Sequence, residues 1–248
     1  MNTTTFAVKN RQINILEQRL LDSWLIIKEV LIKAKNLYKE DVAYHNYLHA
    51  LCVANYALNL QKIWFSAIEV RSLIIAWLFH DAGHTWKVDL LDEFLSLDLY
   101  RKSMDEIQLN NPDFIVNDSI CRHWIIWTVF KNRSKNINKY SKILADFDVW
   151  CIWDTIWAFL YYSSLYGYEL WVDVEKYYNE VEKGYFKFLI MTCKYILISD
   201  EARLILPNSL KNIKKFYEID LNTKKEIFDT LVNEDITLEE FKKRFNLD

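Results

Sequence analysis

Glycine and proline are scarce in this sequence, which contains only 3 Gly and 2 Pro among its 248 residues. Sheet proteins need these residues for their many tight turns, so the chain lacks the means to build an ordinary set of sheet turns. Hydrophobic residues make up 52% of the chain and aromatic residues 16%, which is enough to fill a large core. The composition therefore predicts an all-α protein. Because no change of composition marks a boundary, we expect a single domain over residues 1–248.

Signals for disulfides, secretion, membrane insertion and duplex nucleic-acid binding are also missing. The four cysteines show no C-x-x-C spacing, which predicts free thiols in a reducing compartment. The N-terminus has no charged segment followed by an apolar run, and no apolar stretch has the length of a membrane span. With a formal net charge of −3, the chain has no broad basic surface for duplex nucleic acid. We expect a cytoplasmic protein that binds neither duplex nucleic acid nor a membrane.

Apolar residues recur at steps of three and four along several segments, which is the spacing of amphipathic helices. The segment 67–79 is almost continuously apolar, and a helix that is apolar all round is a central one in a soluble protein. Asp41 is a candidate N-terminal cap for the helix that follows it, at about residues 41–60. The predicted helices cover residues 11–38 (a packing helix), about 41–60, 67–79, 92–108, 119–130, 141–162 and 172–198, with shorter pieces after Pro207.

Four of the five histidines fall in two short strings, Tyr44–His49 and Leu78–His84. His45 and His49 are four residues apart and are expected to share one face of a helix, while the central helix delivers His80 and Asp81 from its end. If the helices pack antiparallel, imidazole nitrogens and carboxylate oxygens meet, and this mixed ligand set suits one or two divalent ions among Mn, Mg, Fe, Ni, Co and Zn. Such an ion lowers the pKa of its bound water toward about 7 and so supplies a nucleophile for a phosphoester.

These strings, together with Leu144-Ala145-Asp146 in a later helix, resemble the HD-domain metal-dependent phosphohydrolase superfamily in the order H…HD…D. Tyr44-His45-Asn46-x-x-His49-Ala50 and His80-Asp81-x-x-His84 are also similar to strings of cyclic-nucleotide phosphodiesterases, although those enzymes carry an acidic residue where this chain has Ala82-Gly83. Asp92-Glu93-x-x-Ser96 resembles the small bacterial and phage HD hydrolases. The resemblance implies a helical HD-domain bundle with its motif core at about residues 41–165, an N-terminal packing helix at 11–38 and C-terminal helices at 172–248.

The resemblance also implies roles for single residues. It implies that Asp81 can bridge two metal ions, that His84 supports the second ion or its water, and that His45 protonates the leaving oxygen. The metal ligands that it implies are His49, His80, Asp81, His84 and Asp146.

The residues alone leave three assignments open: one metal ligand, the proton donor and the substrate-binding residues. Asp148 can replace Asp146 if that helix is rotated. Glu93 or Asp89 can instead hold the water or donate the proton. Lys131 and Arg133 lie in a charged loop before the third motif and are candidates for binding an anionic substrate.

We therefore expect a metal-dependent phosphoric ester hydrolase that acts on a small, phosphorylated, nucleotide-like molecule. A cyclic-nucleotide phosphodiesterase and a nucleotidase or pyrophosphohydrolase are the two substrate hypotheses. An HD-type di-iron oxygenase and a non-catalytic nucleotide-binding HD protein are the alternatives from other functional classes.

Overall fold

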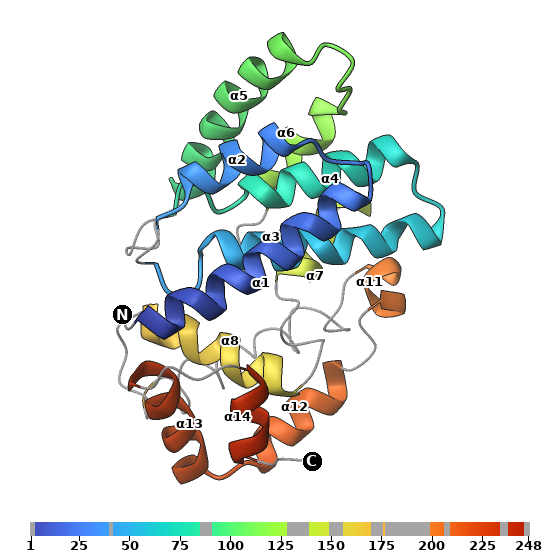
Figure 1. The fold of residues 1–248 in the computed structure, drawn as a ribbon. Helices are drawn as coiled ribbons and strands as arrows, with labels where there is room; N and C mark the ends of the chain where they lie inside the picture. Colours follow the sequence, from blue (N-terminus) through green and yellow to red (C-terminus); the bar gives the residue numbers. More distant parts are fainter. Residues whose placement is uncertain are drawn as a thin grey trace. The chain divides into compact units, whose positions relative to one another are not determined.

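A computed structural model describes residues 3–39, 42–84, 91–127, 139–148, 156–169, 176, 199–205, 209–233 and 238–245 (Figure 1). These residues form helices joined by turns and short irregular segments, and no strand occurs among them, so the all-α class is confirmed. The chain divides into two compact units, Arg11–Asp148 and Met1–Asn10 with Val149–Asp248. Two compact units can belong to one domain, so the single domain over residues 1–248 stays a prediction.

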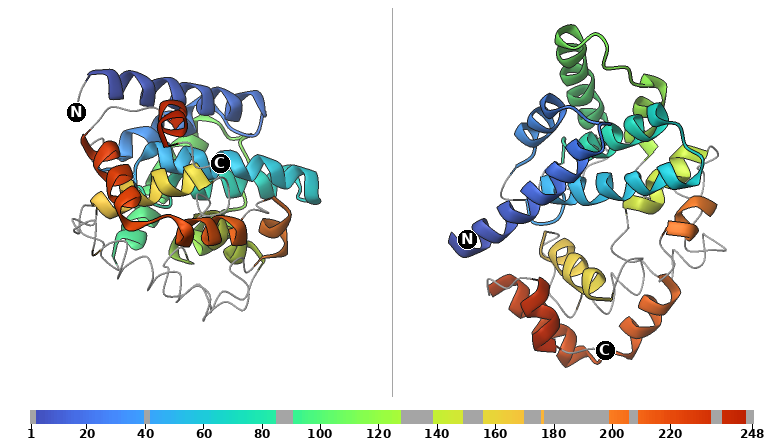
Figure 2. Two further views of the ribbon diagram at one scale, coloured as in Figure 1. Left: turned by 90° about the horizontal axis from the view of Figure 1, so that it is seen from below. Right: turned by 45° about the vertical axis from the view of Figure 1, so that its right-hand side comes forward.

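The unit Arg11–Asp148 is built around helix α4, which contacts α2, α3, α5, α6 and the 3-10 helix η1 (Figure 2). Every α4 residue from Ser72 to Phe79 is buried, and the bounds of α4 are those predicted for the central helix. The unit holds most of α1 (Thr3–Asp22), then α2 (Lys28–Leu37), α3 (Tyr47–Ala57), η1 (Leu58–Ile63), α4 (Ala67–Phe79), α5 (Asp92–Asn110), α6 (Asp118–Trp127) and α7 (Lys139–Asp148).

The prediction of one packing helix over residues 11–38 is wrong, because the chain breaks this stretch into α1 and α2. The Ser23 hydroxyl donates a hydrogen bond to the carbonyl of Leu20 at 2.5 Å and accepts one from the N–H of Leu25 at 3.2 Å. Trp24 has a φ of 60°, in the left-handed region that a right-handed helix cannot contain. Neither Gly nor Pro marks the break, so the apolar periodicity alone could not reveal it.

Besides the start of α1, the other unit contains five described helices, of which α8 packs against α12, α13 and α14. Phe159 of α8 and Phe216 of α12 form an edge-on ring pair with centroids 5.2 Å apart. The stretch predicted as one helix over 141–162 covers most of α7 and the first half of α8, and residues 149–155 between them lie outside the described part. The helix predicted over 172–198 also lies outside it except for Lys176. The helices are α8 (Ile156–Glu169), α11 (Asp200–Ile205), α12 (Ser209–Glu218), α13 (Leu221–Asn233) and α14 (Leu238–Phe245).

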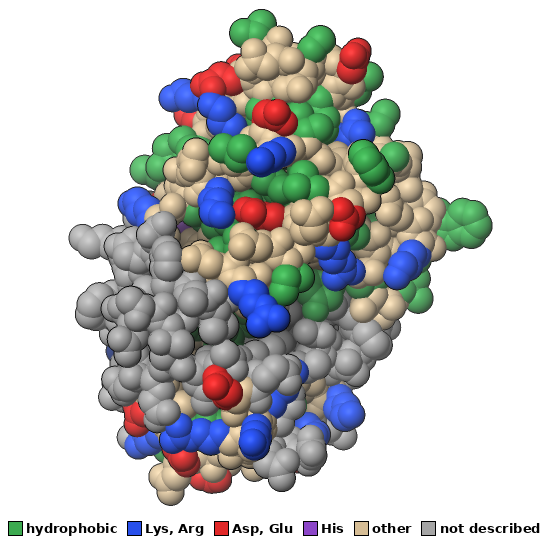
Figure 3. Space-filling model, in the orientation of Figure 1, with side chains coloured by type: hydrophobic (Ala, Val, Ile, Leu, Met, Phe, Trp, Pro, Cys, Tyr) green, Lys and Arg blue, Asp and Glu red, His purple; other side chains and the backbone are tan. Residues whose placement is uncertain are grey.

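The surface is mixed in charge. On the described part of the face in Figure 3, Lys and Arg side chains are interspersed with Asp and Glu, in keeping with the formal net charge of −3. None of the described helices combines the length and the apolar character that a membrane crossing requires.

Candidate metal centre

Helix α3 begins beside the candidate site, and Asn46 caps it. The Asn46 side chain accepts hydrogen bonds from the backbone N–H groups of Leu48, at 3.0 Å, and His49, at 3.2 Å. This cap puts His49 in the first turn of α3 and leaves His45 just before the helix, so the two histidines do not share one helical face as predicted. The predicted cap, Asp41, lies outside the described residues.

A tight turn at the end of α4 carries the His-Asp pair. In this turn the N–H of His84 donates to the carbonyl of Asp81 at 3.0 Å, and the N–H of Gly83 donates to the Ser96 hydroxyl of α5 at 2.8 Å. A Cβ atom on Gly83 would lie 2.6 Å from the carbonyl oxygen of Asp92 and 2.7 Å from the backbone nitrogen of Ser96. Residue 83 must therefore be glycine for the turn to pack against α5, and this contact fixes the positions of Asp81 and His84.

We predict that Gly83→Ala destabilises the protein and weakens the site. The added methyl group meets backbone atoms on α5, which cannot move as a flexible side chain can, so the loss in unfolding free energy should be about 1–3 kcal/mol. Urea unfolding measures this loss, and Ser96→Ala is the matched comparison, because it removes only the hydrogen bond to Gly83 and should cost about 1 kcal/mol. A Gly83→Ala protein as stable as the parent would contradict the close packing of the turn against α5.

A first group of ligand atoms joins α3, the end of α4 and the end of α7. Nε2 of His80 lies 2.9 Å from Oδ2 of Asp81 and 3.1 Å from Oδ1 of Asp148. Nε2 of His49 lies 3.3 Å from the same Asp148 oxygen and 3.5 Å from the same Asp81 oxygen. The four ligand atoms lie within 4.8 Å of one another, and the side chains of His49, His80 and Asp81 are buried. Such a group can hold a metal ion.

Hydrogen bonding orients His80 with its Nε2 toward the two carboxylates. Its Nδ1 lies 2.7 Å from the carbonyl oxygen of Trp77, so Nδ1 carries a proton, and neutral His80 would present a lone pair at Nε2. A lone pair facing carboxylate oxygens is repulsive unless a proton or a cation lies between them. Burial disfavours the charged form of His80, but Asp81 and Asp148 outweigh burial and raise its pKa. In turn, the pKa of Asp148 is lowered, because the hydrogen bonds of His49 and His80 outweigh burial.

A second group consists of His45, Asp81 and His84, whose ligand atoms also lie within 4.8 Å of one another. Nε2 of His84 is 3.3 Å from Oδ1 of Asp81, whereas the other Asp81 oxygen faces the first group. The rings of His45 and His84 are stacked with centroids 4.3 Å apart, and Nδ1 of His84 is 3.8 Å from Oδ2 of Asp92. Burial, followed by the charge of His45, lowers the pKa of His84, although Asp81 opposes this shift. Asp81 thus presents one oxygen to each group.

Buried polar atoms without a hydrogen-bond partner gather at this centre. Among the described residues, eight buried side-chain atoms lack such a partner, and four of them belong to the centre or lie beside it: His49 Nδ1, Asp81 Oδ2, His84 Nδ1 and Glu93 Oε2. Folded proteins leave few buried polar groups without a partner, and a bound ion or ligand often satisfies those that the protein itself does not. The donor set therefore fits a divalent cation.

Asp148 of α7, and not Asp146, lies with His49 and His80 in the first group of ligand atoms. Asp146 is also fully buried, but it belongs to neither group of ligand atoms. Successive helix residues are rotated by about 100° around the axis. Asp146 and Asp148 are two positions apart on α7, so their side chains point in directions about 200° apart, and only one of them can face the histidines. The geometry thus favours Asp148, the alternative that the sequence left open, and the role of either aspartate as a metal ligand stays a prediction.

The remaining predicted residues have different outcomes. Glu93 lies in the first turn of α5, and burial, together with the charges of Asp81, Asp92 and Asp148, raises its pKa to about 7. Asp89, Lys131 and Arg133 lie outside the described residues.

Sequence reasoning did not predict Asp92 as a residue of the centre, although Oδ2 of Asp92 lies 3.8 Å from Nδ1 of His84. The sequence marks Asp92 as a helix start and as part of the Asp92-Glu93-x-x-Ser96 resemblance, and its position just after the His-Asp string was a usable signal. Comparison with known protein families finds no family that matches this sequence, and comparison with curated proteins finds none with significant similarity.

Proposed function

We propose that this protein is an HD-type, metal-dependent phosphohydrolase that cleaves a phosphoester bond of a small, nucleotide-like molecule. The observation that supports this proposal best is the convergence of His49, His80, Asp81 and Asp148 within 4.8 Å, from three segments in the order H…HD…D. The ligand set contains nitrogen and oxygen and no sulfur, which favours catalytic ions such as Mn, Fe, Co, Ni, Zn or Mg over a structural zinc of the finger type.

A dication bound by these residues supplies Lewis acidity and a hydroxide at neutral pH. The chain's own residues can then divide the remaining work. Asp81, with one oxygen toward each group, can hold two ions side by side. His45 is half-buried and stacked on His84, so it can release a proton to a leaving oxygen at the edge of the centre.

Glu93 is a second candidate for the proton donor. In the absence of metal its pKa is raised to about 7, so the carboxyl group can carry and exchange a proton near neutral pH. Separate His45→Gln and Glu93→Gln variants would show which residue is the proton donor. Replacement of the donor should remove the fall of kcat at alkaline pH, whereas replacement of the other residue should leave that fall in place.

The direct test is a hydrolysis panel with Mn-loaded protein. We expect turnover of a cyclic nucleotide if the phosphodiesterase hypothesis holds, and of a mononucleotide or a nucleoside pyrophosphate if the nucleotidase hypothesis holds. His80→Ala should lose both the bound Mn and the activity, because it removes the imidazole that lies between Asp81 and Asp148. Undiminished metal content in His80→Ala would refute the site, and no turnover on the whole panel would refute phosphohydrolase activity.

One observation favours a second candidate, a di-iron oxygenase. The two groups together offer four imidazoles and two carboxylates, because His45 and His84 supply the additional histidines that a two-iron shell needs. Imidazole and carboxylate ligands suit iron. Oxygen uptake by the iron-loaded protein that depends on added organic substrate would favour the oxygenase, and hydrolysis without oxygen uptake would exclude it.

A further inference from the structure

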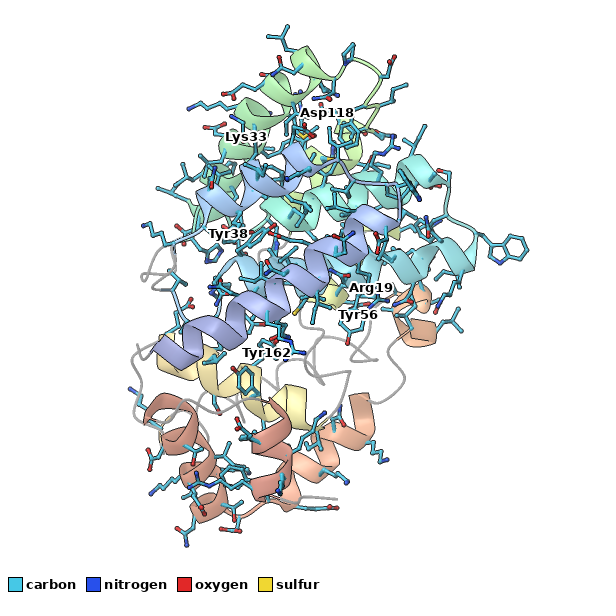
Figure 4. The ribbon with its side chains drawn as sticks, viewed as in Figure 1. Arg19, Lys33, Tyr38, Tyr56, Asp118 and Tyr162 are labelled. Carbon is cyan, nitrogen blue, oxygen red and sulfur yellow. The ribbon has the colours of Figure 1, made fainter. Side chains whose placement is uncertain are left out.

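Two fully buried aromatic side chains join α4 to the end of α7. Trp77 of α4 and Phe147 of α7 have no exposed surface, and their rings are stacked with centroids 5.2 Å apart and planes 22° from parallel. The Phe147 ring also lies edge-on to that of Tyr56 on α3, with centroids 6.3 Å apart (Figure 4). Phe147 therefore contacts the two helices that bring His49 and His80 to the first ligand group.

The stacked pair is connected to the first ligand group through both of its members. The backbone carbonyl of Trp77 accepts a hydrogen bond from Nδ1 of His80 at 2.7 Å. Asp148 directly follows Phe147, and its Oδ1 lies 3.1 Å from Nε2 of His80. The contacts thus form a closed loop, in which α4 meets α7 twice: once through the stacked rings and once through the imidazole and the carboxylate.

The stack also bears on which aspartate of α7 meets the histidines. Phe147 stands between Asp146 and Asp148 in the sequence, and these two carboxylates point in directions about 200° apart. Placing Asp146 where Asp148 lies would need a rotation of α7 by about 160°, which would carry the Phe147 ring out of its buried position. Protein interiors are close-packed, so a displaced ring of this size finds no second position. The stack therefore opposes that rotation.

Trp77 takes part in this contact as an apolar ring. Its indole N–H is buried and has no hydrogen-bond partner among the described residues. Buried tryptophans usually bond this group, and a buried donor without a partner opposes folding. What Trp77 offers here is the face of its ring, and the phenyl ring of phenylalanine can offer such a face as well.

Building on the metal centre of the proposed function, we propose that Trp77 and Phe147 are positioning residues, whose ring stack holds the Asp148 carboxylate against His80. The stack thereby preorganises the first ligand group for a divalent cation. Replacing a residue that orients a metal ligand typically lowers the metal affinity by about 10–100-fold. A pair of rings that only filled the core would have no such effect.

The test compares Phe147→Leu with Phe114→Leu, using calorimetric titration for Mn affinity per folded molecule and thermal unfolding for stability. Phe114 is also buried in this unit, but its ring packs against Arg71 near the start of α4, at the opposite end from His80. Both variants should melt at a lower temperature, because each removes part of a buried ring. Only Phe147→Leu should bind Mn more weakly, by about 10-fold or more. Phe147→Met should behave in the same way, so the test does not depend on one variant folding.

Two further measurements separate positioning from core packing. Trp77→Phe should keep most of the Mn affinity, because a ring face toward Phe147 remains, even if the smaller ring lowers the melting temperature. In a double-mutant cycle, Asp148→Asn should cost less Mn affinity in the Phe147→Leu background than in the parent, because the carboxylate is then no longer held at the group.

The outcomes separate this inference from the proposed function. If the parent binds Mn and Phe147→Leu binds it equally well, or if the effects of Phe147→Leu and Asp148→Asn on Mn affinity simply add, the positioning role is refuted while the proposed function stands. Equal losses of Mn affinity in Phe147→Leu and Phe114→Leu would refute it too. If the parent binds Mn but hydrolyses no phosphoester, the phosphohydrolase proposal fails, and the Mn affinities still decide the role of the ring stack.

Discussion

Replacing Asp148 by asparagine is expected to lower the affinity for Mn by more than about 100-fold, beyond the 10–100-fold that loss of an outer partner of a metal ligand typically costs. One oxygen of Asp148 lies 3.1 Å from Nε2 of His80 and 3.3 Å from Nε2 of His49. Asparagine keeps the shape of the side chain but removes the negative charge that balances the cation. Titration with Mn, followed by elemental analysis of the dialysed protein, measures the change.

Asp146→Asn is the matched control two residues earlier on the same helix. Because Asp146 is fully buried, its replacement can lower stability, so Mn content must be expressed per folded molecule. We expect this variant to retain Mn with nearly the parental affinity. Loss of Mn from Asp146→Asn together with retention by Asp148→Asn would show that α7 has the opposite rotation and would restore the prediction made from the Leu-Ala-Asp string.

The sequence predicted those parts of the fold that local pattern determines. The central helix over 67–79 was predicted at its observed bounds, because a helix that is apolar all round can only be buried. The break between α1 and α2 was missed, because it depends on the Ser23 hydroxyl and on a left-handed Trp24 rather than on glycine or proline.

The sequence could indicate which residues of the candidate centre are close along the chain, but not which residues tertiary packing adds. The two histidine-containing strings identified His49, His80, Asp81 and His84, because adjacency along the chain already brings most of them together. The choice between Asp146 and Asp148 depends on the rotation of α7 against α3 and α4, which no local pattern contains.

In the absence of metal, the unfolding free energy is expected to fall as pH rises from about 7 to 9, and excess Mn should abolish this fall. The folded-state pKa of His80 is raised, so its contribution is fully present below its unfolded pKa of about 6.5 and is lost as pH rises through the folded value. The lowered pKa values of Asp81 and Asp148 give contributions that are lost only in acid, below about pH 4. Alkaline deprotonation of His80 thus leaves its lone pair facing two carboxylates.

Other shifted groups act outside this pH window. The pKa of His84 is lowered, so His84 changes the unfolding free energy only below about pH 6.5. The pKa of Glu93 is raised to about 7, so Glu93 changes it between about pH 4.5 and 7. Burial raises the pKa of Cys121 to about 12, so its effect begins only near pH 9. The range from pH 7 to 9 therefore isolates His80 among these groups.

The slope and its removal by metal are both measurable. A difference of one bound proton between the folded and the unfolded state changes the unfolding free energy by at most about 1.4 kcal/mol per pH unit. A ligand present at 1,000 times its Kd adds about 4 kcal/mol to the unfolding free energy. For a chain of this length, the latter corresponds to a rise in Tm of roughly 8–16 °C, largest at alkaline pH because Mn then no longer competes with the His80 proton. His80→Ala should show neither the alkaline decline nor the Mn-dependent rise. A parent protein whose metal-free Tm is flat from pH 7 to 9 and unmoved by Mn would mean that no proton is held between His80 and the carboxylates, and that no dication replaces it.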